Sequence, residues 1–283
     1  MHHIAIVYKR TRSLAAELTQ RLAHWLEERN IQVISHENID CSRDQCTHKH
    51  LEIPPTVQAV IVLGGDGTLL SVARLLENRT TPIMGINLGG LGFLTEYSIE
   101  NCLREIEHIL DGRYEIEERM RLRVSVVRGE EEIFCHGVLN DAVINKGALA
   151  RIIDLETTID GRYLTRYRGD GLIVATPTGS TAYNLSAGGP IVYPTAKAIM
   201  LTPICSFTLS NRPIIFPPEV IIQVEARGPL QDVTLTCDGQ IGCTLESSDR
   251  IVISAASIPL RLIKTPSIDY FEILRTKLKW GQN

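Results

Sequence analysis

A run of five apolar residues that ends abruptly in a glycine-rich turn limits the folds open to this chain of 283 residues. Residues 59–63 read Ala-Val-Ile-Val-Leu, and Gly64-Gly65-Asp66-Gly67-Thr68 follows directly. Over residues 69–76 the apolar positions return at helical spacing. An all-apolar strand that leads through a tight turn into a helix is typical of a parallel sheet covered by helices.

The alternation of strand and helix continues over the first 116 residues. Residues 36–56 read as a polar connector, and Ser98 and Gly112 are suited to begin and to end a helix. Short apolar runs predict strands at 4–8, 31–34, 59–63 and 82–86, and apolar residues at helical period predict helices at 14–26, 69–76 and 103–110. We therefore expect an α/β N-terminal domain over residues 1–116, built on a parallel sheet with flanking helices.

Beyond this first domain the pattern changes to an alternation with a period of two, which is typical of strands. Arg119, Arg121 and Arg123 alternate with apolar residues, and short β-rich runs separated by turns follow. These runs are 138–144, 152–159, 172–175, 206–209, 220–225, 233–237 and 251–255, and one stretch, 195–201, has a helical pattern. We expect an all-β, sandwich-like C-terminal domain over residues 117–265, and a helical tail over 266–283 that packs back on the first domain.

Charge and composition exclude several classes of function. The chain carries 29 basic and 33 acidic side chains, a net charge of −4, which argues against a broad nucleic-acid-binding face. Aromatic residues make up 5% of the chain, too few for a series of base-stacking platforms. No apolar stretch approaches the roughly 18 residues of a membrane span, so no membrane partner is expected, and the first residues do not read as a signal peptide.

The chain has seven cysteines, an odd number without a paired spacing, which fits free thiols in a reducing cytoplasm. Cys41, Cys46, His48 and His50 lie close together in the sequence, so a metal site is one interpretation of this segment and a polar loop is the other. The spacing fits structural zinc sites poorly, which favours the polar loop.

The segment Gly64-Gly65-Asp66-Gly67-Thr68 has two interpretations. Glycines at the start of a helix let the backbone approach a ligand, and the N–H groups there bind anions. A carboxylate repels phosphate, so Asp66 calls for a reason such as a metal ion or a proton to accept. The alternative is an Asp-Gly turn in which Asp66 caps the helix. The spacings of the P-loop and of the Rossmann fingerprint are both absent from this segment.

Two segments of the second half also carry candidate binding residues. Residues 170–190 hold four glycines and five serine or threonine residues, so donors there can converge on a polar ligand, with Tyr183 as a flat face for a base. Asn140 and Asp141 interrupt an otherwise apolar strand, and the pair can bind a base edge and a ribose diol or form a hydrogen-bonded bulge. Three further polar interruptions of β segments are by default expected at the surface: Arg151, Arg168 and Asp170.

Taken together, these segments resemble the NAD kinase family. The Gly-Gly-Asp-Gly-Thr loop alone is shared with phosphofructokinases and with diacylglycerol and sphingosine kinases. Further similar segments narrow the resemblance: Asn87-Leu88-Gly89-Gly90-Leu91-Gly92-Phe93-Leu94, Asn140-Asp141, residues 176–190, and the ending Lys277-Leu278-Lys279-Trp280-Gly281. The resemblance covers essentially the whole chain and implies an α/β domain, a β-rich domain and a site in the cleft between them. The implied reaction transfers the γ-phosphate of ATP to the 2′-hydroxyl of the adenosine ribose of NAD, giving NADP.

The resemblance also implies roles for individual residues. Asp66 would accept a proton and, with Gly67, contact NAD, and Asn140 and Asp141 would hold NAD. The implied phosphate loop is Gly64, Gly65, Gly67 and Thr68. The remaining implied NAD-binding residues are Arg151, Arg168, Asp170, Thr181, Ala182, Tyr183, Asn184, Leu185, Ser186 and Gln240. Without the resemblance, Gln240 would be assigned to a turn only.

NAD and ATP are the implied substrates, with Mg²⁺ accompanying ATP and no protein ligand of the metal identified. Members of the family are usually homodimers or homotetramers, so a homo-oligomer is expected, with no nucleic-acid partner. Two alternatives stay open: a lipid or sugar kinase with the same loop, and a non-catalytic dinucleotide sensor. The similarity over 176–190 disfavours the first, and the second gives no reason to keep a carboxylate beside phosphates.

Overall fold

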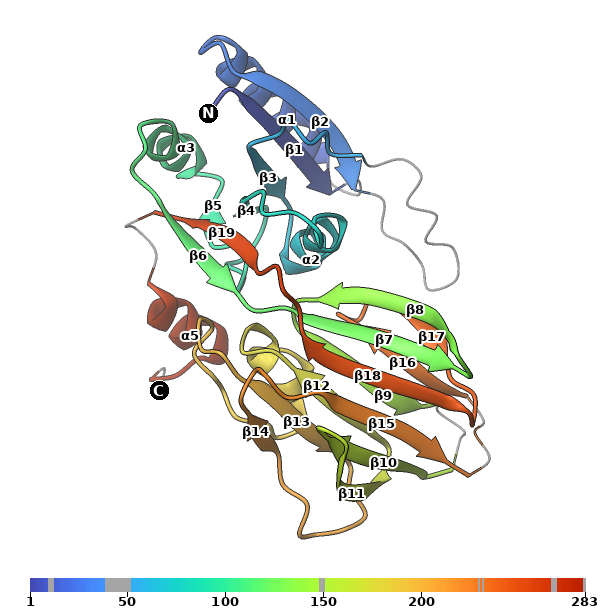
Figure 1. Ribbon diagram of the computed structural model, residues 1–283. Coiled ribbons are helices and arrows are strands. Elements are labelled where there is room, and N and C mark those ends of the chain that lie inside the picture. Colours follow the sequence, from blue (N-terminus) through green and yellow to red (C-terminus); the bar gives the residue numbers. More distant parts are fainter. Residues whose placement is uncertain are drawn as a thin grey trace. The chain divides into compact units, whose positions relative to one another are not determined.

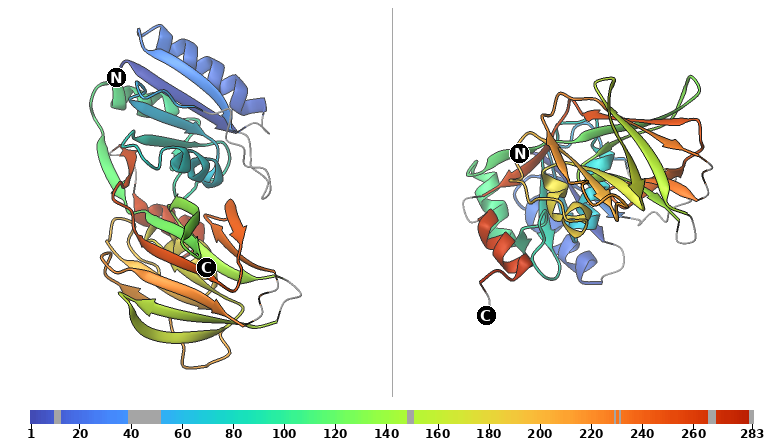
Figure 2. Two further views of the ribbon diagram at one scale, coloured as in Figure 1. Left: turned by 45° about the vertical axis from the view of Figure 1, so that its right-hand side comes forward. Right: turned by 90° about the horizontal axis from the view of Figure 1, so that it is seen from below.

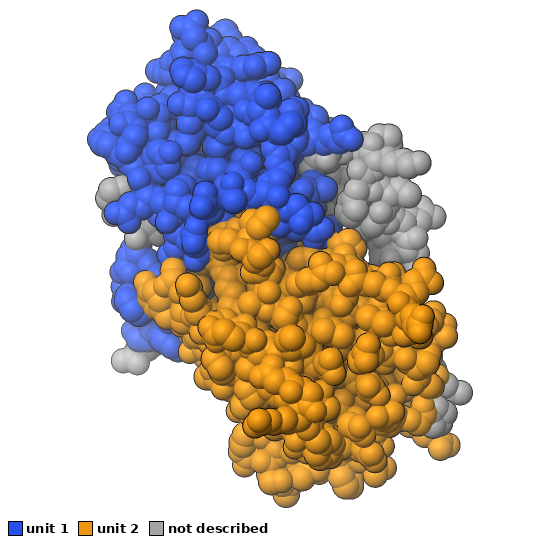
Figure 3. Space-filling model, viewed as in Figure 1, with its two compact units in different colours: residues 1–41, 47–118, 261–283 blue, residues 42–46, 119–260 orange. Residues whose placement is uncertain are grey.

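The computed structural model describes residues 1–9, 13–38, 52–147, 151–228, 230, 232–265 and 269–281. These residues form two compact units, which are coloured separately in Figure 3. Unit 1 takes in the described residues up to Glu118 together with those from Arg261 onward, and unit 2 takes in those from Arg119 to Leu260. The cluster considered above as a metal site lies outside the described residues: Cys41, Cys46, His48 and His50.

Seven strands form the sheet of unit 1: β1 (His3–Lys9), β2 (Gln32–Asn38), β3 (Ala59–Leu63), β4 (Ile83–Asn87), β5 (Tyr97–Ser98), β6 (Glu115–Arg119) and β19 (Leu260–Lys264). Their order is β2-β1-β3-β4-β19-β6, with β5 paired to β4 (Figure 1). The pairs β1–β2, β1–β3, β3–β4, β4–β5 and β4–β19 are parallel. The strands β3 and β4 are buried almost throughout, as expected for parallel strands covered on both faces.

Helices pack on both faces of this sheet. The helices α1 (Ser13–Glu27) and α3 (Cys102–Leu110) share one apolar cluster with Ile4 and Met84, and Figure 2 shows α1 lying along β1 and β2. The helix α2 (Asp66–Leu75) covers the opposite face, where a Cβ on Gly85 would lie 2.7 Å from Leu69 Cδ1. The last helix of unit 1 is α5 (Tyr270–Leu278). No helix in the described part of the chain has the length and apolarity that a bilayer span needs.

Several boundaries in unit 1 differ from those expected. The helix α3 begins after Asn101, whereas Ser98, expected as its N-cap, ends the short strand β5. The helix α2 begins at Asp66, inside the glycine turn. The apolar periodicity predicted this helix only from residue 69. The first turn of a helix carries polar and capping residues rather than core residues, so the periodicity does not mark where the helix begins. The strand β2 also runs on to Asn38, into the segment expected as a connector.

Unit 2 is built from two six-stranded antiparallel sheets. One sheet has the order β11-β10-β15-β18-β7-β8 and consists of β7 (Leu122–Arg128), β8 (Glu131–Val138), β10 (Ile153–Ile159), β11 (Arg162–Gly169), β15 (Ile222–Arg227) and β18 (Asp249–Ala255). The other has the order β14-β13-β12-β9-β16-β17 and consists of β9 (Asp141–Lys146), β12 (Gly171–Ala175), β13 (Ile199–Ile204), β14 (Ile214–Phe216), β16 (Val233–Cys237) and β17 (Ile241–Thr244). The predicted fold class, an α/β domain followed by an all-β sandwich, is confirmed.

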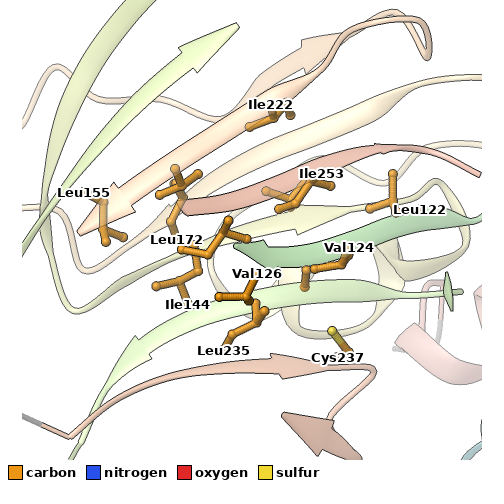
Figure 4. Close-up of a cluster of buried hydrophobic side chains, with 14 of the residues drawn as sticks. Leu122, Val124, Val126, Ile144, Leu155, Leu172, Ile222, Leu235, Cys237 and Ile253 are labelled. Carbon is orange, nitrogen blue, oxygen red and sulfur yellow. The ribbon is translucent and has the colours of Figure 1, made fainter. Parts of the chain in front are cut away.

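A cluster of buried apolar side chains from both sheets forms the core of unit 2 (Figure 4). Leu122, Val124 and Val126 occupy alternate positions of β7, and they share the cluster with Ile144 of β9 and Leu172 of β12 from the other sheet. Burying each such side chain contributes about 1.5–3 kcal/mol to folding. The period of two in the sequence therefore has a direct cause, since alternate residues face this core.

Two segments of unit 2 contradict the sequence predictions. Residues 195–201, expected to be helical, lead into β13, all six residues of which are buried. A short strand buried on both faces shows no period of two, so its apolar run cannot be distinguished from a helix by pattern. Residues 206–209, expected to be a strand, form a bend and turn in which Leu209 is 90% exposed.

Candidate active site

The turn Gly64-Gly65-Asp66-Gly67-Thr68 joins the carboxyl end of β3 to the first residues of α2. Gly64 is required because a Cβ at that position would lie 2.5 Å from the hydroxyl oxygen of Thr68. Gly65 has open space around it and Gly67 is exposed, so the backbone can approach a bound group. The positive end of the α2 dipole lies at this turn, which suits it to bind phosphate.

Four hydrogen bonds from residues 93–95 hold the Asp66 carboxylate. Oδ1 accepts from the N–H groups of Leu94 and Thr95, each at 3.0 Å, and from the Thr95 hydroxyl at 2.9 Å. Oδ2 accepts from the Phe93 N–H at 2.9 Å. The interpretation of Asp66 as a helix cap is wrong, because the N-cap is Gly65 and the carboxylate bonds to the neighbouring loop instead.

Thr95 connects this loop to the end of β4. The residue is fully buried, and its hydroxyl accepts a hydrogen bond from Asn87 Nδ2 at 2.8 Å while donating to Asp66. Asn87 Oδ1 in turn accepts from the Gly89 N–H at 2.8 Å. The glycine-rich run therefore folds back onto Asp66, so closely that a Cβ on Gly92 would lie 2.3 Å from Asp66 Oδ1.

The Asp66 carboxylate has a structural role besides any chemical one. A carboxylate beside a phosphate site was expected only where the chemistry needs one, but Asp66 also holds two loops together. Its presence alone therefore does not separate a kinase from a non-catalytic sensor. Within the described residues Oδ2 accepts one hydrogen bond, so it keeps a lone pair for a substrate hydroxyl.

In unit 2, Asn140 and Asp141 lie where the chain enters β9, between β12 and β16. On one side, Thr176 donates from its N–H to the Asn140 carbonyl at 2.9 Å and from its hydroxyl to the Leu139 carbonyl. On the other side, the Asp238 carboxylate accepts from the N–H groups of residues 139–141 at 3.0, 2.6 and 3.2 Å. The loops that follow β12 and β16 therefore meet at this point.

Asp141 is 4% exposed and lies near a second carboxylate, that of Asp238. Burial, followed by the negative charge of Asp238, raises the pKa of the Asp141 carboxyl to about 7, against a hydrogen bond from the backbone of Tyr183 that lowers it. Near neutral pH the carboxyl therefore exists partly in its protonated form. In that form it can donate a hydrogen bond as well as accept one.

Residues 176–190 form a 3₁₀ turn (Thr178–Thr181) and one helical turn, α4 (Tyr183–Ser186). Gly179 approaches the Asn140 carbonyl so closely that a Cβ would lie 2.1 Å from its oxygen. Tyr183 is 41% exposed, so its ring offers an accessible flat face. The neighbouring predicted residues are half-buried or exposed: Thr181, Ala182, Leu185 and Ser186.

Asn184, in contrast, is fully buried. Its Nδ2 donates to the carbonyls of Ser180 at 3.3 Å and Pro190 at 3.1 Å, and its Oδ1 accepts from the Thr202 hydroxyl at 2.6 Å. The side chain therefore holds this loop against β13. We therefore interpret Asn184 as a residue that supports the loop rather than one that contacts a ligand.

Asp170 lies at the other end of β9 and β12. In this antiparallel pair Asp141 lies opposite Ala175, whereas Asn145 lies opposite Gly171. Four residue steps of extended chain separate these positions, roughly 13 Å. The Asp170 carboxylate lies 3.5 Å from Lys146 Nζ, at the far end.

Arg168 and Arg151 are both exposed and belong with Asp170. Arg168 is the next-to-last residue of β11, before Gly169, and its guanidinium lies 5.6 Å from the ring centre of Phe207. Arg151 precedes β10, in which Ile153 pairs with Gly169. The residues of unit 2 predicted to bind NAD thus fall into two groups, and the structure does not bring these groups together within one chain.

Three residues that touch the predicted site were not predicted. Thr95 holds Asp66, Asp238 holds residues 139–141, and Arg119, which is 2% exposed, donates to the Thr178 hydroxyl at 3.3 Å. For Asp238 a signal existed, since it shares an Asp-Gly turn with Gln240, whose N–H donates to the Cys237 carbonyl at 3.0 Å. Arg119 reads in the sequence as one member of a strand alternation, which hides its burial.

The described residues contain no group of three or more His, Cys, Asp or Glu side chains placed to hold a metal ion. A pocket of about 260 Å³ lies against α3 and α5. Its charged lining residues are mainly acidic, which disfavours phosphate: Glu96, Arg104, Glu105, Asp269 and Glu272.

An α/β unit with a glycine turn suited to phosphate at a helix start, and a β-sandwich with a polar loop system, are together typical of a protein that binds a phosphorylated ligand. The family model of the ATP-NAD kinase N-terminal domain matches residues 4–114, and that of the ATP-NAD kinase C-terminal domain matches residues 139–265. The chain belongs to the NAD kinase family. Its activity is the phosphorylation of NAD by ATP to give NADP, and a lipid or sugar kinase is not favoured.

Curated relatives are similar over their whole length. The NAD kinase of Syntrophobacter fumaroxidans is 67% identical over 282 residues, which cover 100% of both chains. The NAD kinase of Geotalea daltonii is 49% identical over 286 residues, again covering 100% of both chains. The resemblance drawn from the sequence motifs is therefore confirmed.

Two solved structures share the fold. Yeast NADH kinase complexed with NADH has a TM-score of 0.86 at 24% identity, covering 100% of this chain and 89% of that one. An NAD kinase from Archaeoglobus fulgidus in complex with ATP has a TM-score of 0.78 at 28% identity, covering 98% of each chain. Both agree with an α/β unit followed by a β-sandwich.

Proposed function

We propose that Asp66 accepts the proton of the NAD 2′-hydroxyl during phosphoryl transfer. The hydroxyl oxygen attacks the γ-phosphorus of ATP, the bond from that phosphorus to the β,γ-bridging oxygen breaks, ADP leaves, and the proton passes to the carboxylate. A ribose hydroxyl is a weak nucleophile at neutral pH, so a carboxylate within hydrogen-bond reach assists its attack. The observation that carries this assignment is the position of the carboxylate, which four donors fix inside the phosphate loop.

The ATP phosphates bind at the start of α2 in this proposal, beside the phosphate loop Gly64, Gly65, Gly67 and Thr68. The N–H groups of Gly64 and Thr68 donate to the carbonyls of Ile86 and Gly65, so close approach to the glycines and the positive end of the helix dipole support the proposal. The complex of the Archaeoglobus fulgidus enzyme with ATP supports ATP as the donor. A divalent ion such as Mg²⁺ arrives with ATP as part of the substrate, because phosphate oxygens and water supply most of its ligands in such sites. When bound, the ion neutralises charge on the transferred phosphate.

NAD binds to the β-rich domain, residues 117–265, whereas residues 1–116 and the tail 266–283 form the phosphate-binding domain. Asn140 and Asp141 are the central contacts, supported by their place where two loops meet. Tyr183 offers its exposed ring to a base. Gly67 of the phosphate loop also contacts NAD. The other proposed contacts are Arg151, Arg168, Asp170, Thr181, Ala182, Leu185, Ser186 and Gln240, whereas the buried Asn184 acts by supporting the loop that carries them.

The working protein in this proposal is a homodimer or homotetramer. Within one chain, Asn140 and Asp141 lie at one end of β9, whereas Asp170 lies at the other end, together with Arg168 and Arg151. This separation supports an assembly in which a second copy of the chain supplies one of the two sets of residues to each NAD site. Light scattering coupled to size exclusion measures the assembly, and a monomer that is fully active would contradict it. A cytoplasmic location is part of this proposal and is supported by the odd number of cysteines, which have no paired spacing in the sequence.

The variant Asp66→Asn tests the assignment of the proton acceptor. We expect a loss of about 10²–10⁴-fold in kcat, the usual range for removal of a general base, with the affinity for NAD within a few-fold of wild type. NADP formation is followed with a coupled dehydrogenase, and NAD binding by calorimetry. The exposed Asp111→Asn is the matched control and should leave both unchanged. Wild-type turnover by Asp66→Asn would remove Asp66 from the mechanism.

A further inference from the structure

We propose that Asp238 is a positioning residue for NAD, which holds the backbone of Asn140 and Asp141 in the geometry that binds the substrate. This inference rests on the proposed role of Asn140 and Asp141 in NAD binding. Asp238 itself acts through the strand rather than by contact with the reacting atoms.

The first support is the number and direction of the hydrogen bonds that Asp238 makes. Its Oδ1 accepts from the N–H groups of Asn140 at 2.6 Å and Asp141 at 3.2 Å, and its Oδ2 accepts from the Leu139 N–H at 3.0 Å. Its own N–H donates to the Asp141 carbonyl at 2.9 Å. One residue therefore contacts three consecutive peptide groups just where β8 gives way to β9.

The second support is the backbone conformation of the turn that carries Asp238. Asp238 has φ +50° and Gly239 has φ +65°, both in the left-handed region. Asp, Asn and Gly tolerate this region best, so replacement by Asn or Gly keeps the turn while changing the acceptors. The turn joins β16 to β17, and β16 pairs with β9, so the carboxylate is carried on a strand next to its targets.

The third support comes from the opposite side of residues 139–141. The Thr176 N–H donates to the Asn140 carbonyl, and Gly179 leaves no room for a side chain against that carbonyl oxygen. The segment is thus held from both sides, while Asn140 itself remains half-buried and accessible. Loss of the Asp238 bonds would free one side only, which loosens the segment without unfolding the sandwich.

The charge of Asp238 gives a second property that can be measured. The groups that act on the Asp141 carboxyl are Asp238, from the β16–β17 turn, and the backbone of Tyr183, from α4. The negative charge of Asp238 raises the pKa of Asp141, so its removal lowers that pKa. A residue that merely stabilises the turn would not change the ionisation of its neighbour in this way.

The test uses Asp238→Gly and Asp238→Asn in the full-length enzyme. Glycine removes all the acceptors, and we expect the KM for NAD to rise at least tenfold while kcat and the KM for ATP stay within about threefold of wild type. Asparagine keeps one oxygen acceptor and should recover part of the loss. In Asp238→Asn the midpoint of the pH dependence of the KM for NAD should move to lower pH.

A matched control exists in the same unit. Asp160 has φ +49°, precedes a glycine of positive φ, and accepts a hydrogen bond from the Ile221 N–H at 2.8 Å, in a β-hairpin turn outside the site. Asp160→Gly makes the same backbone change in a turn of the same conformation and should leave the KM for NAD unchanged. An unchanged KM for NAD in Asp238→Gly, or a parallel loss of kcat and of affinity for both substrates, overturns the inference.

Asn140→Ala separates this inference from the proposal on which it rests. If Asn140→Ala raises the KM for NAD and Asp238→Gly does not, the positioning role is wrong and the NAD site stands. If neither variant changes the KM for NAD, the assignment of NAD to this strand is itself wrong.

Discussion

Thr95 Oγ1 lies 2.9 Å from Asp66 Oδ1 and 2.8 Å from Asn87 Nδ2, so one buried hydroxyl joins the glycine turn after β3 to the end of β4. Because β3 and β4 are neighbouring parallel strands, their carboxyl ends lie at the same edge of the sheet. The position of the Asp66 carboxylate therefore depends on the glycine-rich loop after β4 as much as on the turn after β3 that carries Asp66.

Gly92→Ala tests this dependence. The new Cβ would lie 2.3 Å from both Asp66 Oδ1 and Thr95 Oγ1, so the carboxylate or the loop must move. We expect kcat for NADP formation to fall at least tenfold, and the free energy of unfolding in urea to fall by about 1–3 kcal/mol. Gly90→Ala is the matched control, because a Cβ there meets open space. Equal effects of the two variants would contradict the role of the close approach.

Asn184→Ala is expected to act mainly on stability. The variant leaves the Thr202 hydroxyl and two buried carbonyls without their partner and opens a small cavity, which together cost about 2–3 kcal/mol of unfolding free energy. Urea unfolding measures this loss. Asn211→Ala, in a loop where the amide donates one bond to Ser206, should cost far less. A raised KM for NAD at unchanged stability would show instead that Asn184 contacts NAD directly.

Asp141 should make the stability of the protein depend on pH. The pKa of its carboxyl is about 7 in the folded state, against about 3.9 for an unperturbed Asp. Between these two pH values the Asp141 carboxyl keeps its proton in the folded state but loses it in the unfolded state. The contribution of Asp141 to the free energy of unfolding is therefore complete below about pH 4 and is lost as the pH rises through about 7.

Asp141→Asn mimics the protonated carboxyl at every pH and isolates this contribution. The quantity to follow is the unfolding free energy of wild type minus that of the variant. Between pH 4 and pH 8 this difference should fall by a few kcal/mol, because each unit of pKa shift corresponds to about 1.4 kcal/mol. Urea unfolding at a series of pH values provides the measurement. A difference that is flat across this range would show that Asp141 titrates normally.

Much of the fold could be predicted from the sequence because its causes are local. The run at 59–63 became β3 as expected, and alternate residues of 122–126 face the core of unit 2. The prediction failed at 195–201, where burial on both faces of β13 removes the periodicity that would mark a strand. It failed also at Ser98, where strand pairing with β4 took a residue suited to a helix cap.

The sequence by itself determined that an α/β domain is followed by an all-β domain, and it showed the glycine turn around Asp66. Through the resemblance it also indicated the family. Tertiary structure decided what the carboxylates do. Asp66 bonds to residues 93–95, and Asp238 to residues 139–141, across separations in the chain that no local pattern records. A hydrogen bond or a shifted pKa depends on which groups the fold brings within a few ångströms, and only packing of the strands sets that.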